Sequence, residues 1–333
     1  MFHTWLLGWW KRYKIKTKPV RRRVGLWLRL LGGKLVGRYD FETFKRLCLD
    51  LAQQGHHSVF IGVVRGYDPC LQLPKLGAKF ITGGAAEGSL NAFRILETPV
   101  PAFEKIYRRD ASEWARCLFF YDTVLPGMDY CLLRIPRLLE HAKGLRLLLA
   151  HFELVEINSV SKRIHLELAC RVITTLRSVP LSIKAEDQWL GSWQSTPFFT
   201  ERIRMTRKVL KSEQLSFFPV ERFLYLASSL PRFAAHGDLN ASNVGAGGLV
   251  IDWDCFGYFP AEYDVALVVA LYIDADGAFV PEIDLFLSSS YQGLDAVTSL
   301  EDYRTNVYSL ALIMANKRKT KLALYNRLFR VSA

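Results

Sequence analysis

The sequence has few features of an exported or membrane-spanning protein. No uninterrupted apolar run approaches the roughly 18–20 residues needed to cross a bilayer, and the longest candidate covers only residues 265–273. The N-terminal apolar stretch precedes its basic residues, and no small-residue cleavage site follows, so it does not resemble a secretory signal. The six cysteines are scattered without a Cys-x-x-Cys pair, which argues against a disulfide framework or a zinc site. These absences predict a cytoplasmic protein.

Acidic residues are absent from the first 39 positions, which hold 11 of the 44 Lys and Arg residues. The remaining chain has 33 bases against 32 acids, so the net charge of +12 belongs to the N-terminus. Trp and Leu alternate with these bases over residues 1–38. Apolar insertion, with about 1 kcal/mol from each cation near anionic lipid, favours peripheral attachment to the cytoplasmic face of a membrane. A solvated tail is the alternative, and no base-reading module suggests a nucleic-acid partner.

Half of the 333 residues are hydrophobic, which is enough for two lobes with separate cores. We expect four parts: a basic segment over 1–38, an N-terminal extension over 39–78, and two lobes over 79–152 and 153–333. Within the extension, apolar spacing predicts an amphipathic helix over 39–54 and a short buried strand over 58–64.

The first lobe has the pattern of an antiparallel five-stranded sheet with one helix. Strands are predicted over 78–82, 90–96, 102–108, 134–140 and 145–152, and the helix over 110–124. The second lobe is predominantly helical, with helices predicted over 159–178, 200–212, 219–229, 263–273, 281–290 and 300–328 and a loop-and-strand segment over 235–256. The predicted fold class is α+β.

The strongest chemical signal is HGDLNASN at 236–243, followed by VIDWD at 250–254. Phosphoryl transfer needs a carboxylate near the attacking hydroxyl and oxygen ligands for magnesium. The kinase catalytic loop places an Asn five residues after its Asp, and Asp238 and Asn243 have this spacing. Asp252 ends an apolar strand, where a carboxylate is costly to bury unless it meets a cation or donors. Carboxylate and amide oxygens suit Mg²⁺.

These two segments, together with YDVA at 263–266, resemble the signature region of aminoglycoside phosphotransferases and choline kinases. The resemblance implies a bilobal protein-kinase-like fold that uses ATP and Mg²⁺, and it covers residues 79–275. Five residues receive roles from it: Asp238 as catalytic base, Asn243 and Asp252 as metal ligands, His236 as a support of the loop, and Asp264 as a buried brace. For Asp254 the choice between metal binding and solvation stays open.

The first lobe contains candidates for holding the nucleotide. Lys105 lies centrally on a predicted strand, where an unpaired ammonium would be costly, and we expect it to bind the ATP phosphates. Glu113, on the first turn of the next helix, is the candidate ion-pair partner; the alternative is that it only complements the helix dipole.

A turn and a strand complete the predicted ATP site. Backbone N–H groups of the turn over 83–89, with Gly83, Gly84 and Gly88, can cover phosphates, although most such turns are only hairpins. The strand ending at 152 resembles the one that enters the kinase hinge, so the backbone of Ala150, His151 and Phe152 is expected to bind the adenine edge.

The predicted function is transfer of the ATP γ-phosphoryl group to a hydroxyl of a small molecule or of a membrane-associated glycoconjugate, such as a lipid-linked sugar. Two alternatives stay open. One is an aminoglycoside-type antibiotic kinase, for which Asp274, Asp276, Glu282 and Asp284 would bind the polycation. The other is a non-catalytic pseudokinase scaffold recruited to membranes. The acceptor, the position phosphorylated and the oligomeric state do not follow from the sequence.

Overall fold

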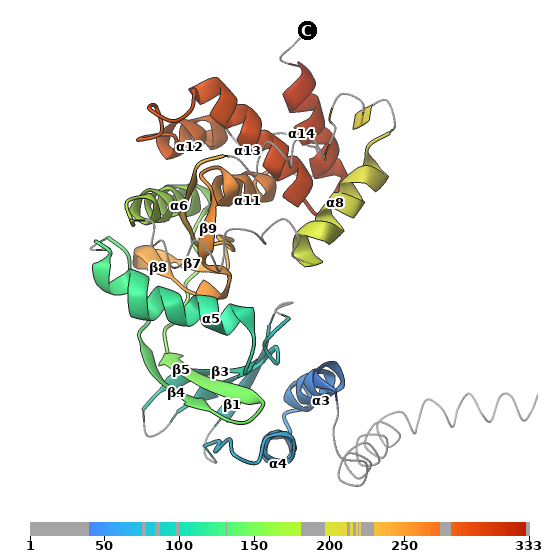
Figure 1. The fold of residues 1–333 in the computed structure, drawn as a ribbon, viewed down its shortest axis with the longest axis vertical. Helices are drawn as coiled ribbons and strands as arrows, with labels where there is room; N and C mark the ends of the chain where they lie inside the picture. Colours follow the sequence, from blue (N-terminus) through green and yellow to red (C-terminus); the bar gives the residue numbers. More distant parts are fainter. Residues whose placement is uncertain are drawn as a thin grey trace, which may run out of the picture. The chain divides into compact units, whose positions relative to one another are not determined.

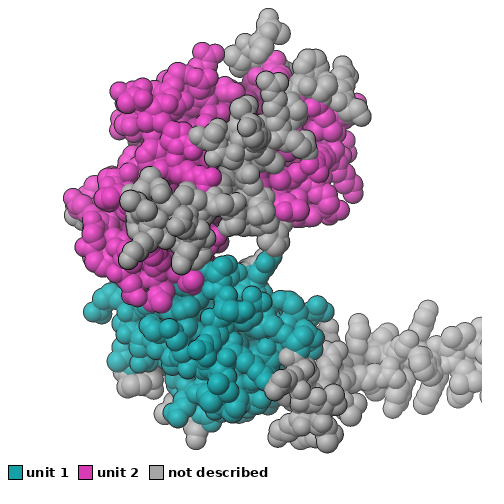
Figure 2. All heavy atoms as spheres, viewed as in Figure 1, with its two compact units in different colours: residues 1–114, 137–154 teal, residues 115–136, 155–333 magenta. Residues whose placement is uncertain are grey.

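The chain divides into two compact units (Figures 1 and 2). The first contains residues 1–114 and 137–154, and the second contains residues 115–136 and 155–333. The computed structural model describes residues 40–74, 78–83, 87–97, 100–130, 132–180, 197–211, 214–215, 218, 220, 230–273 and 281–330. Several predictions lie outside these residues: the basic segment over 1–38, nearly all of the helix over 219–229, Gly84, Asp274 and Asp276.

The first unit is built on the predicted five-stranded antiparallel sheet. Its strands follow the spatial order β1-β2-β3-β5-β4. Their bounds are Ala78–Thr82 for β1, Ala92–Leu96 for β2, Ala102–Arg108 for β3, Leu138–Lys143 for β4 and Leu147–Glu153 for β5. The prediction of this sheet is confirmed, and the bounds of the third strand match.

The start of β4 was predicted too early, at residue 134. Arg134 belongs to the second unit. Its N–H donates to the Gly248 carbonyl and its carbonyl accepts from the Val250 N–H, at 2.9 Å each. Pro136 follows and has no N–H to donate to a ladder. The strand therefore begins only at Leu138.

Two helices of the extension cover one face of the sheet. Helix α3 (Phe41–Gln53) matches its prediction, and the Asp40 carboxylate caps it by accepting from the Thr43 N–H at 2.9 Å. The predicted strand over 58–64 is wrong, because this segment lies in helix α4 (His57–Tyr67). Its apolar residues recur at helical spacing and form one buried stripe, which comprises Phe60, Ile61, Val63 and Val64.

The helices and the sheet share a single core. Buried side chains of α3 and α4 pack with Leu90, Ala92, Ile106, Leu147 and Leu149 of the sheet region. Because successive strand residues alternate faces, these positions identify the face covered by the helices. The opposite face carries the odd-numbered residues of β3, including Lys105.

The second unit is mainly helical and has its own larger core. Among its described residues, α5 (Ser112–Phe119) begins in the first unit and continues as a π-helical turn over Phe120–Val124. The other helices are α6 (Lys162–Arg177), α8 (Pro197–Val209), α11 (Tyr263–Leu271), α12 (Glu282–Ser290), α13 (Leu300–Met314) and α14 (Arg318–Arg330). Two antiparallel two-stranded sheets pair β6 (Arg232–Ala235) with β9 (Gly257–Pro260) and β7 (Val244–Gly245) with β8 (Leu249–Val250).

The prediction of one helix over 300–328 is wrong, because the structure has two helices here: α13 ends at Met314 and α14 begins at Arg318. The buried ammonium of Lys321 in α14 donates to the carbonyls of Leu312 and Ile313, each at 2.8 Å, and to the Thr206 hydroxyl at 2.7 Å. These bonds satisfy carbonyls that the last turn of a helix leaves without a partner. No helix within the described ranges is both long and apolar enough to span a membrane.

Candidate active site

The loop after β6 is held in place by a buried carboxylate. The two oxygens of Asp264, in the first turn of α11, accept from the backbone N–H groups of His236 and Gly237 at 2.7 and 3.0 Å. Burial raises the pKa of Asp264 to about 6, and these two hydrogen bonds oppose that rise. The carboxylate is therefore mainly ionised at neutral pH and fixes the backbone just before Asp238. This position fits the predicted role of Asp264 as a buried brace.

His236 connects the loop to the segment that carries Asp252. Its Nε2 lies 2.9 Å from the Ile251 carbonyl, and its Nδ1 accepts from the Asp238 N–H at 3.3 Å. Because a carbonyl only accepts and an N–H only donates, the ring must carry its proton on Nε2. Burial lowers the pKa of His236 to about 4, which keeps the ring neutral. Trp253 packs against this ring, with centroids 4.6 Å apart.

Gly237 is required for the shape of the loop. Its φ is +82°, in the left-handed region that favours glycine. A Cβ at this position would also lie 2.1 Å from the Cys255 carbonyl oxygen. The sequence HGD therefore needs its central glycine for both conformation and space.

Asp238 and Asn243 are in direct contact. The Asn243 Nδ2 donates to the Asp238 carbonyl oxygen at 2.9 Å and to its Oδ2 at 3.1 Å. Since the amide nitrogen faces Asp238, the amide oxygen is the atom of Asn243 that can bind a cation. The five-residue spacing thus joins the predicted base to the predicted metal ligand.

Asp252 immediately follows the residue that holds the two segments together. Ile251 donates its N–H to the Asn243 carbonyl at 3.0 Å, and its own carbonyl accepts from His236. Asp252 is exposed and adopts a left-handed backbone with φ 66° and ψ 61°. Non-glycine residues in this region are uncommon and concentrate at functional sites. Asp254, two residues later, is buried.

The donor set of Asn243 and Asp252 fits magnesium, which takes hard oxygen ligands and keeps several positions for phosphate and water. The described part of the chain contains no group of three His, Cys, Asp or Glu side chains that could hold a metal by themselves.

In the first unit, Lys105 is 6% exposed and lies on the sheet face opposite α3 and α4. Its ammonium lies 5.6 Å from the Phe93 ring centroid and 5.4 Å from that of Tyr107. Ala150 is its cross-strand neighbour on β5. Lys105 thus shares a face with the strand residues expected to bind adenine, Ala150 and Phe152.

The described part of the Gly-rich turn contacts Glu113. The Glu113 Oε1 accepts from the Gly88 N–H at 2.8 Å. A Cβ on Gly88 would lie 2.4 Å from Glu113 Oε2 and 2.5 Å from the Ala111 Cβ, so only glycine fits. At Gly83, a Cβ would meet the Phe93 ring at 2.1 Å. Sequence reasoning missed this role of Glu113, while the predicted Lys105–Glu113 ion pair stays a prediction.

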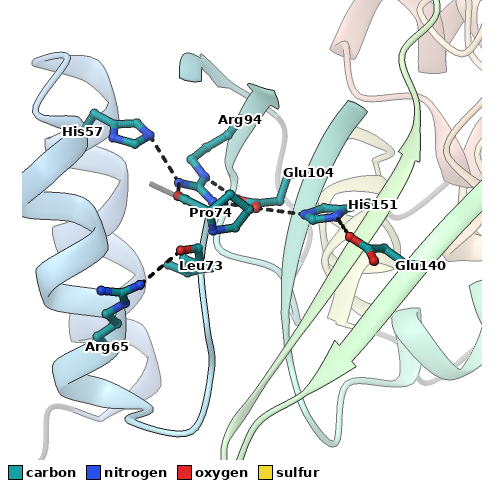
Figure 3. A network of polar contacts seen from close by, with 8 residues as sticks. All are labelled: His57, Arg65, Leu73, Pro74, Arg94, Glu104, Glu140 and His151. Carbon is teal, nitrogen blue, oxygen red and sulfur yellow. Dashed lines mark hydrogen bonds and ion pairs between the residues drawn. The ribbon is translucent and has the colours of Figure 1, made fainter. Parts of the chain in front are cut away.

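The side chain of His151 belongs to a polar network on the helix-covered face (Figure 3). Its Nε2 lies 3.1 Å from Glu104 Oε2 and its Nδ1 2.6 Å from Glu140 Oε1. Glu104 forms a fully buried ion pair with Arg94, and Arg94 reaches His57 of α4 at 3.3 Å. Burial alone would lower the pKa of His151, but its two carboxylate partners raise it.

This network limits what His151 can do at a nucleotide site. Its side chain is engaged on the face opposite Lys105. Its backbone lies on a strand that pairs on both edges, with β3 and with β4, and the same holds for Ala150 and Phe152. The predicted contact of these backbone groups with the adenine edge is therefore wrong, because a strand inside a sheet has no unpaired edge to offer a ligand. Arg94 and Glu104 are direct cross-strand partners on β2 and β3. The available sequence signal was a pair of opposite charges on two consecutive predicted strands, since such pairs stabilise antiparallel sheets.

Comparison with known proteins gives a family match and several similar folds. The model of the phosphotransferase enzyme family matches residues 84–297. An aminoglycoside-3′-phosphotransferase of type VIII is 18% identical, with a TM-score of 0.41 over 77% of this chain and 99% of that one. The choline kinase LicA from Streptococcus pneumoniae is 13% identical, with a TM-score of 0.40 over 78% and 94%.

A third solved structure, the aminoglycoside phosphotransferase APH(3″)-Id from Streptomyces rimosus, is 14% identical, with a TM-score of 0.39 over 82% of this chain and 97% of that one. No curated protein sequence matches the chain.

Proposed function

We propose that this chain, which belongs to the phosphotransferase enzyme family, transfers the γ-phosphoryl group of ATP to a membrane-associated glycoconjugate. Members of this family phosphorylate an alcohol group, and this chain is such an enzyme. The proposed acceptor group is a hydroxyl of a molecule such as a lipid-linked sugar. The observation that carries the chemistry is the contact between Asp238 and Asn243 on a loop fixed by His236 and Asp264. The basic and aromatic composition of residues 1–38 supports an acceptor at a membrane surface.

In the proposed reaction Asp238 is the base. Its carboxylate orients the acceptor hydroxyl and takes its proton as the hydroxyl oxygen forms a bond to the γ-phosphorus; the bond to the β–γ bridging oxygen breaks and ADP leaves. The Asn243 amide holds the carboxylate through Oδ2, which limits its rotation. Pre-positioning of this kind lowers the cost of orienting the two reactants.

The remaining side chains would hold ATP and Mg²⁺. Asn243 and Asp252 would hold the cation, which when bound neutralises charge on the phosphates. Lys105 would contact the phosphates from the sheet. Gly83 and Gly88 provide a turn with little side-chain bulk, suited to close approach of a phosphate.

The chemistry is tested with the Asp238→Asn variant. Asn keeps an oxygen that can accept from Asn243 but cannot take a proton, so turnover of ATP with magnesium should fall about 10²- to 10⁴-fold. Asp295→Asn, at an exposed position of the same unit, is the matched control and should retain activity. Labelled ATP incubated with membrane lipid extracts would reveal the acceptor. Equal turnover by Asp238→Asn and the wild type would refute the assignment.

The membrane part is tested separately with vesicles. The full chain should co-sediment with vesicles containing phosphatidylglycerol more strongly than with pure phosphatidylcholine, because cations gain only from anionic lipid. A chain that begins at Tyr39 should lose this binding. Equal sedimentation of the two proteins would remove the proposed membrane surface as a partner while leaving the kinase chemistry intact.

The described residues do not favour the antibiotic-kinase alternative. Asp284, one of the acids considered for a polycation, pairs with Arg327 at 3.1 Å, and it lies with Glu282 in the first turn of α12, where acids complement the helix dipole. Drug resistance on expression would revive this alternative. A thermal-shift titration with ATP and magnesium tests the scaffold alternative, since a ligand that binds the native state raises its midpoint.

A further inference from the structure

Helix α3 lies outside the region matched by the family model, yet it contacts the Gly-rich turn. The Lys45 ammonium on α3 donates to the Glu87 carbonyl oxygen at 3.1 Å. The next residue, Gly88, donates its N–H to Glu113 at 2.8 Å and accepts from the Arg108 N–H at 2.7 Å. The returning arm of the turn is thus held by three elements: α3, β3 and α5.

The helix that carries Lys45 is firmly seated on the first unit. Phe44 and Cys48, on either side of Lys45, are fully buried in the core shared with the sheet. The Phe44 ring also stacks on Tyr67 of α4, with centroids 3.9 Å apart. This packing fixes the position of the Lys45 backbone relative to the sheet, and therefore to the turn that the sheet carries.

Lys45 is also a cation among carboxylates. Partial burial lowers the pKa of Lys45, and the carboxylates of Glu42, Glu113 and Glu87 oppose this by favouring its charged form. The last two of these acids flank the returning arm of the turn. Without the ammonium, their negative charge would oppose the approach of an anionic phosphate.

We propose that Lys45 is a positioning residue for ATP: it fixes the backbone at Glu87–Gly88 and offsets the acidic charge beside the turn, so that the turn can accept the nucleotide phosphates. This inference rests on the proposed function, in which the turn covers those phosphates. It gives the extension a part in the reaction that the family-matched region does not supply by itself.

The test is a calorimetric titration of the full-length chain with two probes, the non-hydrolysable ATP analogue AMP-PNP with magnesium and adenosine. Lys45→Met removes both the hydrogen bond and the charge, whereas Lys45→Arg keeps a cationic donor. Lys143→Met, at an exposed lysine on β4, is the matched control. Hydrogen exchange of the peptide covering 87–96 reports the turn without any nucleotide.

Lys45→Met should weaken AMP-PNP binding about 10-fold, the loss expected for a hydrogen bond from a charged group, and adenosine binding less than about 2-fold, since adenosine has no phosphate to respond to the turn. Lys45→Arg should recover most of the loss, and exchange near Gly88 should quicken in Lys45→Met alone. An equal loss for both ligands, or no loss relative to Lys143→Met, would overturn the inference. A wild-type chain that fails to bind AMP-PNP would instead overturn the proposed function, and this inference with it.

Discussion

Acid should destabilise the loop over 236–243 through His236. The ring is buried and neutral, with Nδ1 accepting from the Asp238 N–H and Nε2–H donating to the Ile251 carbonyl. A proton added to Nδ1 would turn this acceptor into a donor that faces another donor. Both the position of Asp238 and the link to Ile251 would then be disturbed.

The size of the effect follows from the pKa of His236. Burial lowers it from 6.5 to about 4, so the unfolded chain binds this proton below pH 6.5, whereas the folded chain binds it only near pH 4. Stability is therefore complete above pH 6.5 and falls as the pH drops toward 4. The full loss is about 3 kcal/mol, at 1.36 kcal/mol for each pKa unit.

The assay compares the wild type with His236→Gln in urea at pH 7.5, 6.5, 5.5 and 4.5, monitored by tryptophan fluorescence. Gln can still donate to the Ile251 carbonyl but does not titrate. Between pH 7.5 and 4.5, the free energy of unfolding of the wild type should fall by about 2.5 kcal/mol relative to that of the variant. The raised pKa of Asp264 acts in the opposite direction, since it adds stability as the pH falls below about 6, but it is present in both proteins and cancels. Parallel pH profiles would refute the reasoning.

Three further predictions concern other parts of the chain. Gly88→Ala should weaken ATP binding at least about 10-fold, because its Cβ would overlap Glu113 and Ala111; Gly127→Ala, where no atom lies within 4 Å, is the control and should bind normally. Burial lowers the pKa of Lys321 to about 7, so above pH 7 the unfolded chain binds more protons than the folded chain. In urea unfolding, the free energy of unfolding of the wild type should therefore rise by about 3 kcal/mol relative to that of Lys321→Met between pH 7 and 9.5. Chelation of magnesium with EDTA should abolish ATP turnover while leaving the urea midpoint unchanged, because few protein groups would hold the ion; a lower midpoint would indicate a structural metal instead.

Most of the sheet followed from the sequence because alternation over β1, β2 and β3 is a local pattern. The prediction of a strand over 58–64, which lies in helix α4, was wrong for a related reason. A short apolar run fits a buried strand and a helix face equally well, and only its packing on the sheet beside α3 selects the helix. The break between α13 and α14 was missed because no proline or paired glycine marks it, and the capping ammonium of Lys321 comes from the following helix.

The sequence alone predicted the chemistry proposed for the loop, since the spacing of Asp238, Asn243 and Asp252 is fixed by the covalent chain and their residue types are those that phosphoryl transfer needs. Tertiary structure decided which groups hold these residues in place. The Asp264 carboxylate reaches the His236 N–H from 28 residues away, and the Lys45 ammonium reaches the Glu87 carbonyl from 42. Contacts over such separations depend on how helices and strands pack, and no local pattern of residues records them.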